Sequence, residues 1–307
     1  MSSSSNLQAL NGKKARAGNR SDAIVIPSPV INYVRPTLYL GNDEYAGPAD
    51  IWNPDKGFLV QSINSESYNL NFPTTGAHNL YFDLLISGDI EELTWEPVTH
   101  EGITATVTNV VPNDYWIPDE DKGQVVARVK LIGPEAKNQW GNPNPSRIAK
   151  PQLPQTFELV GRDIYGVEVV KYGFVLRQWF VSRGGQFTNH SNQTTWCNSL
   201  GYRMPRVRDL TNAKCGVRGN FPCINGVDGA KPSSGNWVYQ RQIGAGFFTE
   251  WGCMPDYNYP NADAFADSWT SDAAAGSNQF AVDSRFGYVY NLSASDPLGR
   301  PGLCTAP

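Results

Sequence analysis

Several features that are common in nucleic-acid-binding and membrane proteins are missing from this 307-residue sequence. Charged residues make up 18% of it and the net charge is −4, whereas proteins that bind nucleic acids are normally basic. No apolar run approaches the roughly 20 residues that a membrane-spanning helix requires. Long runs of Ala, Leu, Glu and Lys are absent, while Gly (29) and Pro (22) are plentiful. This balance favours strands and turns over helices.

Catalytic signatures are missing as well. The three histidines, His78, His100 and His190, belong to no HExxH motif, and no GxSxG sequence is present. Gly244 and Gly246 begin a dinucleotide-like fingerprint that lacks its third glycine. We therefore expect a protein that is not an enzyme.

Cysteine is absent from the first 196 residues. The five that follow are Cys197, Cys215, Cys223, Cys253 and Cys304. No pair has CxxC spacing, which argues against structural zinc. Their confinement to one half predicts a disulfide-bearing domain in an oxidising compartment, with one thiol left over because the number is odd. Five buried free thiols in a cytosolic protein are the alternative.

The first 25 residues contain no apolar segment that could act as a secretory signal. They are polar and basic, and we expect residues 1–25 to form a flexible tail. Two origins are open. The chain is either a fragment of a larger secreted protein with an added start, or an intracellular or phage protein with a native tail.

Residues 26–170 have the pattern of an antiparallel β-sandwich. Short apolar or alternating runs are separated by turn residues, as such folds require. The runs are Leu38–Leu40, Phe58–Val60, Asn79–Ile86, Ile103–Thr108, Val125–Leu131, Thr156–Val160 and Val167–Val170. With no cysteine in this half, its stability must come from packing between the sheets.

Residues 171–307 have a different pattern. A strand over Tyr172–Val181 is followed by a short helix over Thr194–Leu200, which Gly201 ends. A second helix is expected over residues 208–213, and two strands, Gln279–Asp283 and Tyr288–Asn291, close the chain. Residues 214–268 show little periodicity, and a loop of that length inside a compact domain indicates a functional region.

This order of elements resembles the C-type-lectin-like adhesion domain of the intimin/invasin family of bacterial outer-membrane adhesins. The resemblance rests on several segments in the same order: Tyr172–Val181, Trp196–Cys197, Leu200–Pro205, Asp209–Leu210, Thr249–Gly252, Trp269–Asp272, and Phe280–Asp283 followed by Cys304. It implies an Ig-like sandwich over residues 26–170, packed on a lectin-like α+β domain over residues 171–307. It also implies that Trp179, Trp251 and Trp269 belong to the core.

The resemblance implies one disulfide, between Cys197 and Cys304. The bond would close a loop of about 107 residues and constrain the unfolded chain by ~4–5 kcal/mol on the entropic model. For the remaining cysteines the preferred pair is Cys215 with Cys223, and the rival is Cys223 with Cys253.

Calcium chemistry does not transfer with the resemblance. Tyr259-Pro-Asn261 has the Pro-Asn of the lectin calcium motif but lacks its acid, and no Trp-Asn-Asp follows. We expect no cofactor and no metal. The alternative is calcium held by oxygen ligands from Asp256, Asn258, Asn261, Asp263 and Asp267.

Two segments are candidate ligand-binding sites. The first is the loop over residues 253–265, because Tyr supplies rigid contact area while Asn and Asp supply directed hydrogen bonds. Its candidate residues are Asp256, Tyr257, Asn258, Tyr259, Asn261 and Asp263. The other reading is that its aromatic residues form a small core beneath the loop. The second segment offers Trp237, Tyr239 and Arg241, which are hot-spot residue types.

The predicted function is that of an adhesin tip at the cell surface, outside the cell. It would be the distal part of a larger outer-membrane-anchored protein and would bind a host or neighbouring-cell receptor, protein or glycan, through loops on a rigid scaffold. No nucleic-acid partner and no membrane insertion by this segment are expected. The alternatives are a phage or secreted receptor-binding protein of the same fold and an enzyme on a lectin-like scaffold.

Overall fold

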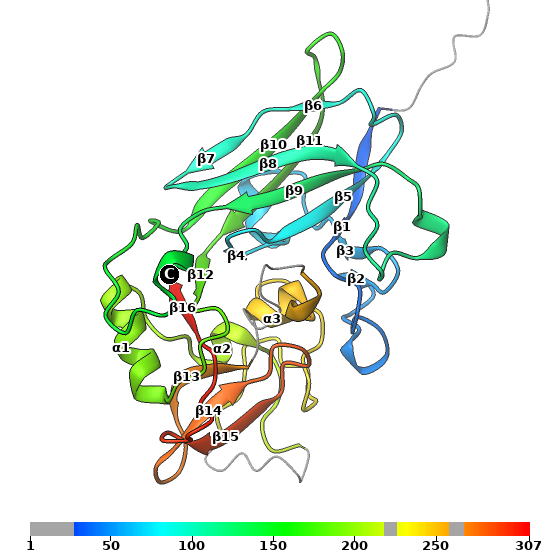
Figure 1. The fold of residues 1–307 in the computed structure, drawn as a ribbon. Helices are drawn as coiled ribbons and strands as arrows, with labels where there is room; N and C mark the ends of the chain where they lie inside the picture. Colours follow the sequence, from blue (N-terminus) through cyan, green and yellow to red (C-terminus); the bar gives the residue numbers. More distant parts are fainter. Residues whose placement is uncertain (1–27, 218–225, 258–266) are drawn as a thin grey trace, which may run out of the picture.

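The computed structural model describes residues 28–217, 226–257 and 267–307. Strands dominate it, and helices are few and short (Figure 1). The strands are β1 Val30–Arg35, β2 Trp52–Asn53, β3 Gly57–Leu59, β4 Thr75–Ala77, β5 Tyr81–Ser87, β6 Thr94–Trp95, β7 Val98–His100, β8 Ile103–Val110, β9 Val126–Ile132, β10 Gln155–Arg162, β11 Glu168–Leu176, β12 Gln178–Ser182, β13 Ser268–Ala273, β14 Asn278–Val282, β15 Val289–Ser293 and β16 Leu303–Ala306. The α-helices are α1 His190–Leu200, α2 Val207–Leu210 and α3 Phe247–Trp251, and the 3-10 helices are η1 Asp43–Tyr45, η2 Ser65–Leu70, η3 Asp119–Asp121, η4 Lys137–Gln139 and η5 Met254–Asp256. The expected mainly β first half and α+β second half are confirmed.

The first half is a sandwich of two sheets. One has the order β2-β3-β1-β5-β9-β8-β7 and the other the order β11-β10-β6. Strand β8 shows why the chain folds this way, since Ile103, Ala105 and Val107 are buried and the residues between them are more exposed. An alternating strand buries one face against the opposite sheet and leaves the other face toward solvent.

Aromatic rings fill the space between the two sheets. Phe82 of β5 meets Phe174 of β11 edge to face at 5.9 Å, and Phe157 of β10 stacks on Phe174 at 5.3 Å. Each ring is fully buried. Such packing supplies the stability that no disulfide provides in this half of the chain.

The expected single strand over Tyr172–Val181 is two strands. Strand β11 continues to Leu176 in the sandwich, the chain leaves that sheet at Arg177, and β12 starts a new one. Residue 171, the boundary expected from the sequence, therefore lies inside β11.

Strand β12 joins the two halves of the chain. It pairs antiparallel with β16 at the C-terminal end and parallel with β4 from the first half, Gln178 lying opposite Thr75 and Phe180 opposite Ala77. The first half thus contributes a strand to a sheet of the second half. Buried side chains of both halves belong to one continuous core.

Helix α1 ends at Leu200 as predicted but begins at His190, four residues before the predicted Thr194. The Asn189 side chain accepts a hydrogen bond from the Asn192 backbone N–H at 2.9 Å, which caps the first turn. Gly201 ends the helix with φ of 86°, as expected. The buried residues Gln193, Trp196, Cys197 and Leu200 have the i, i+3, i+4, i+7 spacing of one helix face.

The disulfide between Cys197 and Cys304 is confirmed and ties α1 to β16 across 107 residues. Cys215 is disulfide-bonded, and Cys223, its expected partner, lies outside the described residues. Cys253 carries a free, buried thiol, so the rival pairing of Cys223 with Cys253 is wrong.

Three local predictions differ from the structure. Residues 38–40 lie in a turn after β1, the second helix shortens to α2, and α3 lies within the expected loop over 214–268. Helix α3 has only five residues, all buried, so it depends on packing and has no amphipathic period to reveal it. Within the described ranges, no helix has the length and apolarity to cross a bilayer.

Candidate functional site

Tyr239 and Arg241 are not binding residues, because neither side chain has any exposed surface. The Arg241 guanidinium lies over the Trp52 ring at 4.2 Å. It donates hydrogen bonds to the carbonyl oxygens of Thr37 at 3.0 Å and Glu250 at 2.9 Å. Arg and Tyr are common hot-spot residues at binding surfaces, but Arg241 and Tyr239 instead pack in the core that the two halves share. Trp237 is partly exposed and its ring lies 5.7 Å from that of Tyr288.

Glu250 of α3 is the other buried charge at this junction. Its carboxylate accepts hydrogen bonds from the backbone N–H groups of Thr74 (3.0 Å), Thr75 (3.0 Å) and Gly244 (2.9 Å), and from the hydroxyls of both threonines. Burial raises the pKa of Glu250, and these hydrogen bonds oppose that change. Glu250 and Arg241 therefore fix the second half against the first.

Tyr257 agrees with the alternative prediction that the aromatic residues of its segment form a small core. It is 2% exposed, and its hydroxyl accepts from the Thr37 N–H and donates to the Trp251 carbonyl, both at 2.9 Å. As a ligand-binding residue it is therefore a wrong prediction. Asn258, Tyr259, Asn261 and Asp263 lie outside the described residues.

Asp256 is partly exposed at the end of η5. Its carboxylate accepts a hydrogen bond from the Thr37 hydroxyl at 3.2 Å. It also accepts hydrogen bonds from the Tyr115 hydroxyl and the Cys253 thiol. Burial is the main cause that raises its pKa. Asp256 faces a surface formed by the first half, which the sequence did not single out.

That surface is an aromatic groove formed by residues of the first half, which meets the second half at Pro255 and Asp256 and is called the junction groove below. Tyr39 and Tyr115 are 42% and 64% exposed, and their rings meet edge to face at 5.8 Å. Trp116 adjoins Tyr115 at 5.4 Å and also contacts the buried Tyr257 ring. The connection between β8 and β9, which carries Tyr115 and Trp116, lies on the same side of the molecule as β1, β2 and β3 (Figure 1).

Two hollows flank the Tyr115–Trp116 pair. The volume of the larger is about 440 Å³ and that of the smaller about 330 Å³, and both open to solvent. The larger is lined by Leu38, Tyr39, Leu40, Asn42, Pro54, Asp55, Tyr115, Trp116 and Pro118. The smaller is lined by Asn113, Asp114, Tyr115, Trp116, Pro255 and Asp256. The groove thus combines apolar rings with carboxylate and amide side chains.

One buried and one partly buried ion pair hold the β8–β9 connection in place. Asp114 pairs with Arg128 of β9 at 2.6 Å and accepts a hydrogen bond from the Tyr81 hydroxyl at 2.7 Å. Farther along, Asp121 pairs with Arg35 of β1 at 2.7 Å. Charge-assisted contacts at both ends of a loop fix its course, so the exposed rings between them are pre-positioned.

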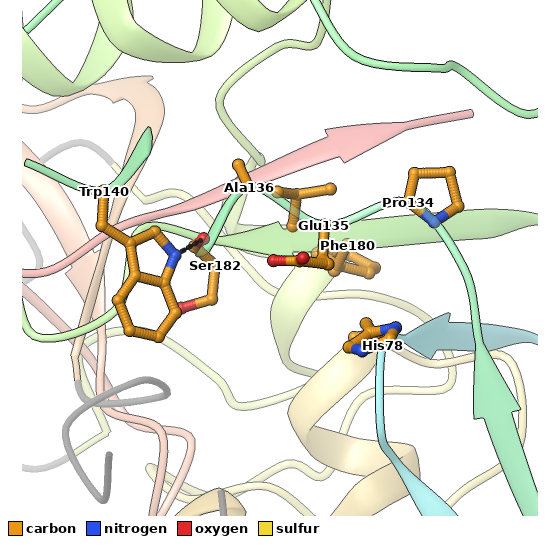
Figure 2. A pocket seen from close by; sticks show the side chains of 9 residues that line it. His78, Pro134, Glu135, Ala136, Trp140, Phe180 and Ser182 are labelled. Carbon is orange, nitrogen blue, oxygen red and sulfur yellow. Dashed lines mark hydrogen bonds between the residues drawn. The ribbon is translucent and has the colours of Figure 1, made fainter. Parts of the chain in front are cut away.

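A crevice beside His78 has no room for a substrate. Figure 2 shows it between His78, Glu135, Phe180 and Trp140, whose indole N–H donates to the Ser182 carbonyl at 2.8 Å. Its volume of about 10 Å³ is that of one water. The Gly133 N–H donates to His78 Nδ1 at 3.2 Å, and burial lowers the pKa of this histidine.

The other residues of types that often act in catalysis, His100, His190 and Cys253, make contacts that serve the fold. His100 packs edge to face on Phe157, and His190 Nε2 lies 2.9 Å from the Thr270 carbonyl oxygen. Burial and the nearby Asp256 raise the pKa of the Cys253 thiol, the opposite of what a thiolate nucleophile needs. In the part of the chain that the structure describes, no group of three His, Cys, Asp or Glu is arranged to hold a metal.

Sequence reasoning missed Tyr39, Tyr115 and Trp116. A signal was present, since Tyr115-Trp116 lies between the turn-forming residues Asn113-Asp114 and Pro118-Asp-Glu-Asp121. Large aromatic residues in such a loop are not explained by the packing of a core strand. Its significance depends on Tyr39, which is 76 positions away in the sequence, so only the fold reveals the site.

Comparisons with known proteins give distant structural similarities. No protein-family model matches the chain, and no curated protein matches it either. The structure is similar to that of invasin, a bacterial integrin-binding protein, with 12% identity, 91% of this chain and 39% of the invasin chain covered, and a TM-score of 0.49. It is also similar to a C-terminal 282-residue fragment of intimin in complex with the intimin-binding domain of the translocated intimin receptor, with 13% identity, 91% and 65% coverage and a TM-score of 0.47. An intimin mutant from EHEC O157:H7 has 10% identity, 92% and 100% coverage and a TM-score of 0.44.

Proposed function

We propose that this chain is a receptor-binding module of a cell-surface adhesin and that it binds through the junction groove. The observation that carries the proposal is the pair of exposed rings, Tyr39 and Tyr115, which meet edge to face on the surface of the first half and line one hollow. Aromatic side chains dominate the energetics of protein interfaces when a surrounding rim excludes water from them. Large exposed rings gathered in a groove are therefore a binding feature rather than a folding one.

The scaffold suits a binding role because a surface that is already fixed loses little conformational freedom when a partner binds. Strand β4 pairs with β12, and Glu250 and Arg241 link the halves through buried hydrogen bonds. Binding to a surface that is already ordered avoids part of the entropic cost of association. Affinity would then come from the groove and from the loop that follows Asp256.

The wider setting is part of the same proposal. The chain spans 39% of the length of the invasin chain and 65% of the intimin fragment chain. We infer that it serves as the exposed end of a longer surface protein, outside the cell. Invasin binds integrins and the intimin fragment binds its translocated receptor, and a protein receptor is the partner that we propose for this chain too.

A cell-binding assay tests the proposal. Fluorescently labelled protein is added to host cells and measured by flow cytometry, with Tyr115→Ala and Tyr39→Ala as variants. Loss of an anchor residue costs about 2 kcal/mol, so we expect each variant to bind roughly thirtyfold more weakly. Tyr165→Ala is the matched control, since Tyr165 is 83% exposed on the β10–β11 hairpin, away from the groove.

The same assay separates the kinds of receptor. Protease treatment of the cells should abolish binding if the receptor is a protein, whereas binding that survives protease and appears on a glycan array identifies a sugar. Equal binding by Tyr115→Ala, Tyr39→Ala and the wild type would exclude the junction groove.

A further inference from the structure

We propose that the junction groove takes a cationic side chain, an arginine of a protein receptor, between its aromatic walls. This inference rests on the proposed function and names the chemistry of the partner at that site. It follows from the angles between the rings and from the charge that surrounds them.

The rings form walls rather than a platform. The planes of Tyr39 and Tyr115 make an angle of 62°, and those of Tyr115 and Trp116 an angle of 79°. A sugar stacks on one open ring face, which needs a flat exposed surface. A cation is attracted to the faces of several rings at once, and rings at steep angles to one another can surround it.

The charge around the groove is negative. The two segments that line the larger hollow and its rim, residues 38–57 and 113–122, contain eight carboxylates and two lysines. Both lysines have partners, Lys56 with Asp121 at 2.7 Å and Lys122 with Asp119. Arg35 and Arg128 of the neighbouring strands pair with Asp121 and Asp114, so four cations stand against the eight carboxylates. The field at the groove therefore attracts cations and repels anionic groups.

Asp55 is placed to pair with the incoming charge. It is exposed, it lines the larger hollow together with Tyr39 and Tyr115, and within the described ranges it makes no ion pair. A side chain entering the hollow would meet ring faces and one free carboxylate. That combination suits arginine, whose planar guanidinium stacks on aromatic rings and also donates hydrogen bonds in a fork.

Saturation-transfer difference NMR with short peptides tests this chemistry without knowledge of the receptor. The probes are acetyl-Gly-Arg-Gly-amide and its citrulline analogue, which has nearly the same shape and no charge, at millimolar concentration with the full chain. A desolvated cation–π contact strengthens binding roughly tenfold, so we expect the arginine peptide to bind about tenfold more tightly than the citrulline peptide. Raising the salt concentration should weaken the arginine peptide selectively.

Two variants locate the peptide, and each has a control. Tyr115→Leu removes a wall and Asp55→Asn removes the free carboxylate, and each should weaken the arginine peptide by about threefold to tenfold. Tyr165→Leu and Asp89→Asn alter an exposed tyrosine and an exposed aspartate elsewhere and should leave binding unchanged.

The possible failures are distinguishable. Equal or absent signals from the two peptides, or an arginine signal that survives Tyr115→Leu, overturn the cationic partner even if cell binding still depends on Tyr115. Methyl hexosides that give saturation transfer lost in Tyr115→Leu, with no arginine signal, assign the groove to a sugar instead. If substitution of Tyr115 leaves cell binding unchanged but abolishes binding of the arginine peptide, the proposed function fails and the cation site stands.

Discussion

At the scale of single residues, the buried charges explain why residues predicted to bind a ligand are structural instead. Arg241 and Glu250 are fully buried, and each satisfies backbone groups that come from the other half of the chain. A buried charge is tolerated when its hydrogen bonds are made, and removing it then leaves several partners unsatisfied. The stability of the junction therefore depends on individual side chains.

Glu250→Ala should lower the free energy of unfolding by about 3–5 kcal/mol, because the N–H groups of Thr74, Thr75 and Gly244 would lose their acceptor in the core. Urea denaturation followed by tryptophan fluorescence measures the change. Glu91→Ala, at an exposed position, is the control and should change stability by less than about 0.5 kcal/mol. Equal stability of the two variants would show that the carboxylate is not needed.

The pH dependence of stability should reflect Asp283. Burial and the nearby Asp267 raise the pKa of Asp283 to about 7, while its carboxylate accepts hydrogen bonds from the N–H groups of Arg285 and Phe286. The folded state therefore holds a proton that the unfolded state has lost, and stability falls as the pH rises from about 4 to about 7.

Asp283→Asn should remove this dependence and stabilise the protein at pH 8 by roughly 1–3 kcal/mol, since the amide oxygen can still accept both N–H groups. Urea midpoints of both proteins between pH 4 and pH 8 measure it. Parallel curves for the two proteins would assign the pH dependence to other groups.

At the scale of elements, the connections matter as much as the strands. Helix α1 is specified by its own sequence, from the Asn189 cap to Gly201. The β8–β9 connection has no regular structure except η3, yet ion pairs to β1 and β9 hold it and present Tyr115. Local sequence sets the first element, and contacts across the fold set the second.

Gly201→Ala should destabilise the chain by about 1 kcal/mol, because a Cβ at a φ of 86° strains the backbone. The new methyl group would meet only the Arg147 side chain, at 3.5 Å, so steric crowding adds little. Gly141→Ala is the control, as its Cβ would lie in open space, and it should be within about 0.5 kcal/mol of the wild type. Thermal melting followed by circular dichroism compares the two variants.

At the scale of the whole molecule, the two halves depend on each other. Strand β4 of the first half pairs with β12, and the Phe72 ring of the first half lies 5.0 Å from Trp251 of α3. The division into two domains near residue 170 remains a proposal. Because the halves share these contacts, we expect them to fold cooperatively. The second half reaches the junction groove at Pro255 and Asp256, which line the smaller hollow.

Residues 171–307 alone should therefore fail to fold. Without β4, the β12 edge loses its partner, Glu250 loses its threonine donors, and the Trp251 face is exposed to water. Amide dispersion in a two-dimensional NMR spectrum should be poor for this fragment and good for residues 28–307. A well-dispersed spectrum of the shorter fragment would show that the second half is an independent domain.

The sequence by itself determined the features with a short repeat. Alternating residues specify β8, and Gly201 marks the end of α1, so β8 and residues 194–200 of α1 were predicted without any other part of the chain. The first turn of α1, which Asn189 caps, was not predicted. The sequence also predicted the Cys197–Cys304 bond through its resemblance to a known family, and placed Trp179, Trp251 and Trp269 in the core, where all three are fully buried.

The tertiary structure alone decided which residues form the surface. Thr37 and Tyr257 are 220 positions apart and share a hydrogen bond, and contacts of this kind bury Tyr257 while leaving Tyr39 and Tyr115 exposed. A hydrophobic period reports which face of one element is apolar, but it does not report which other element will cover that face. The junction groove depends on that second fact, because Tyr39 and Tyr115 come from separate segments of the first half and only the folded chain brings them together.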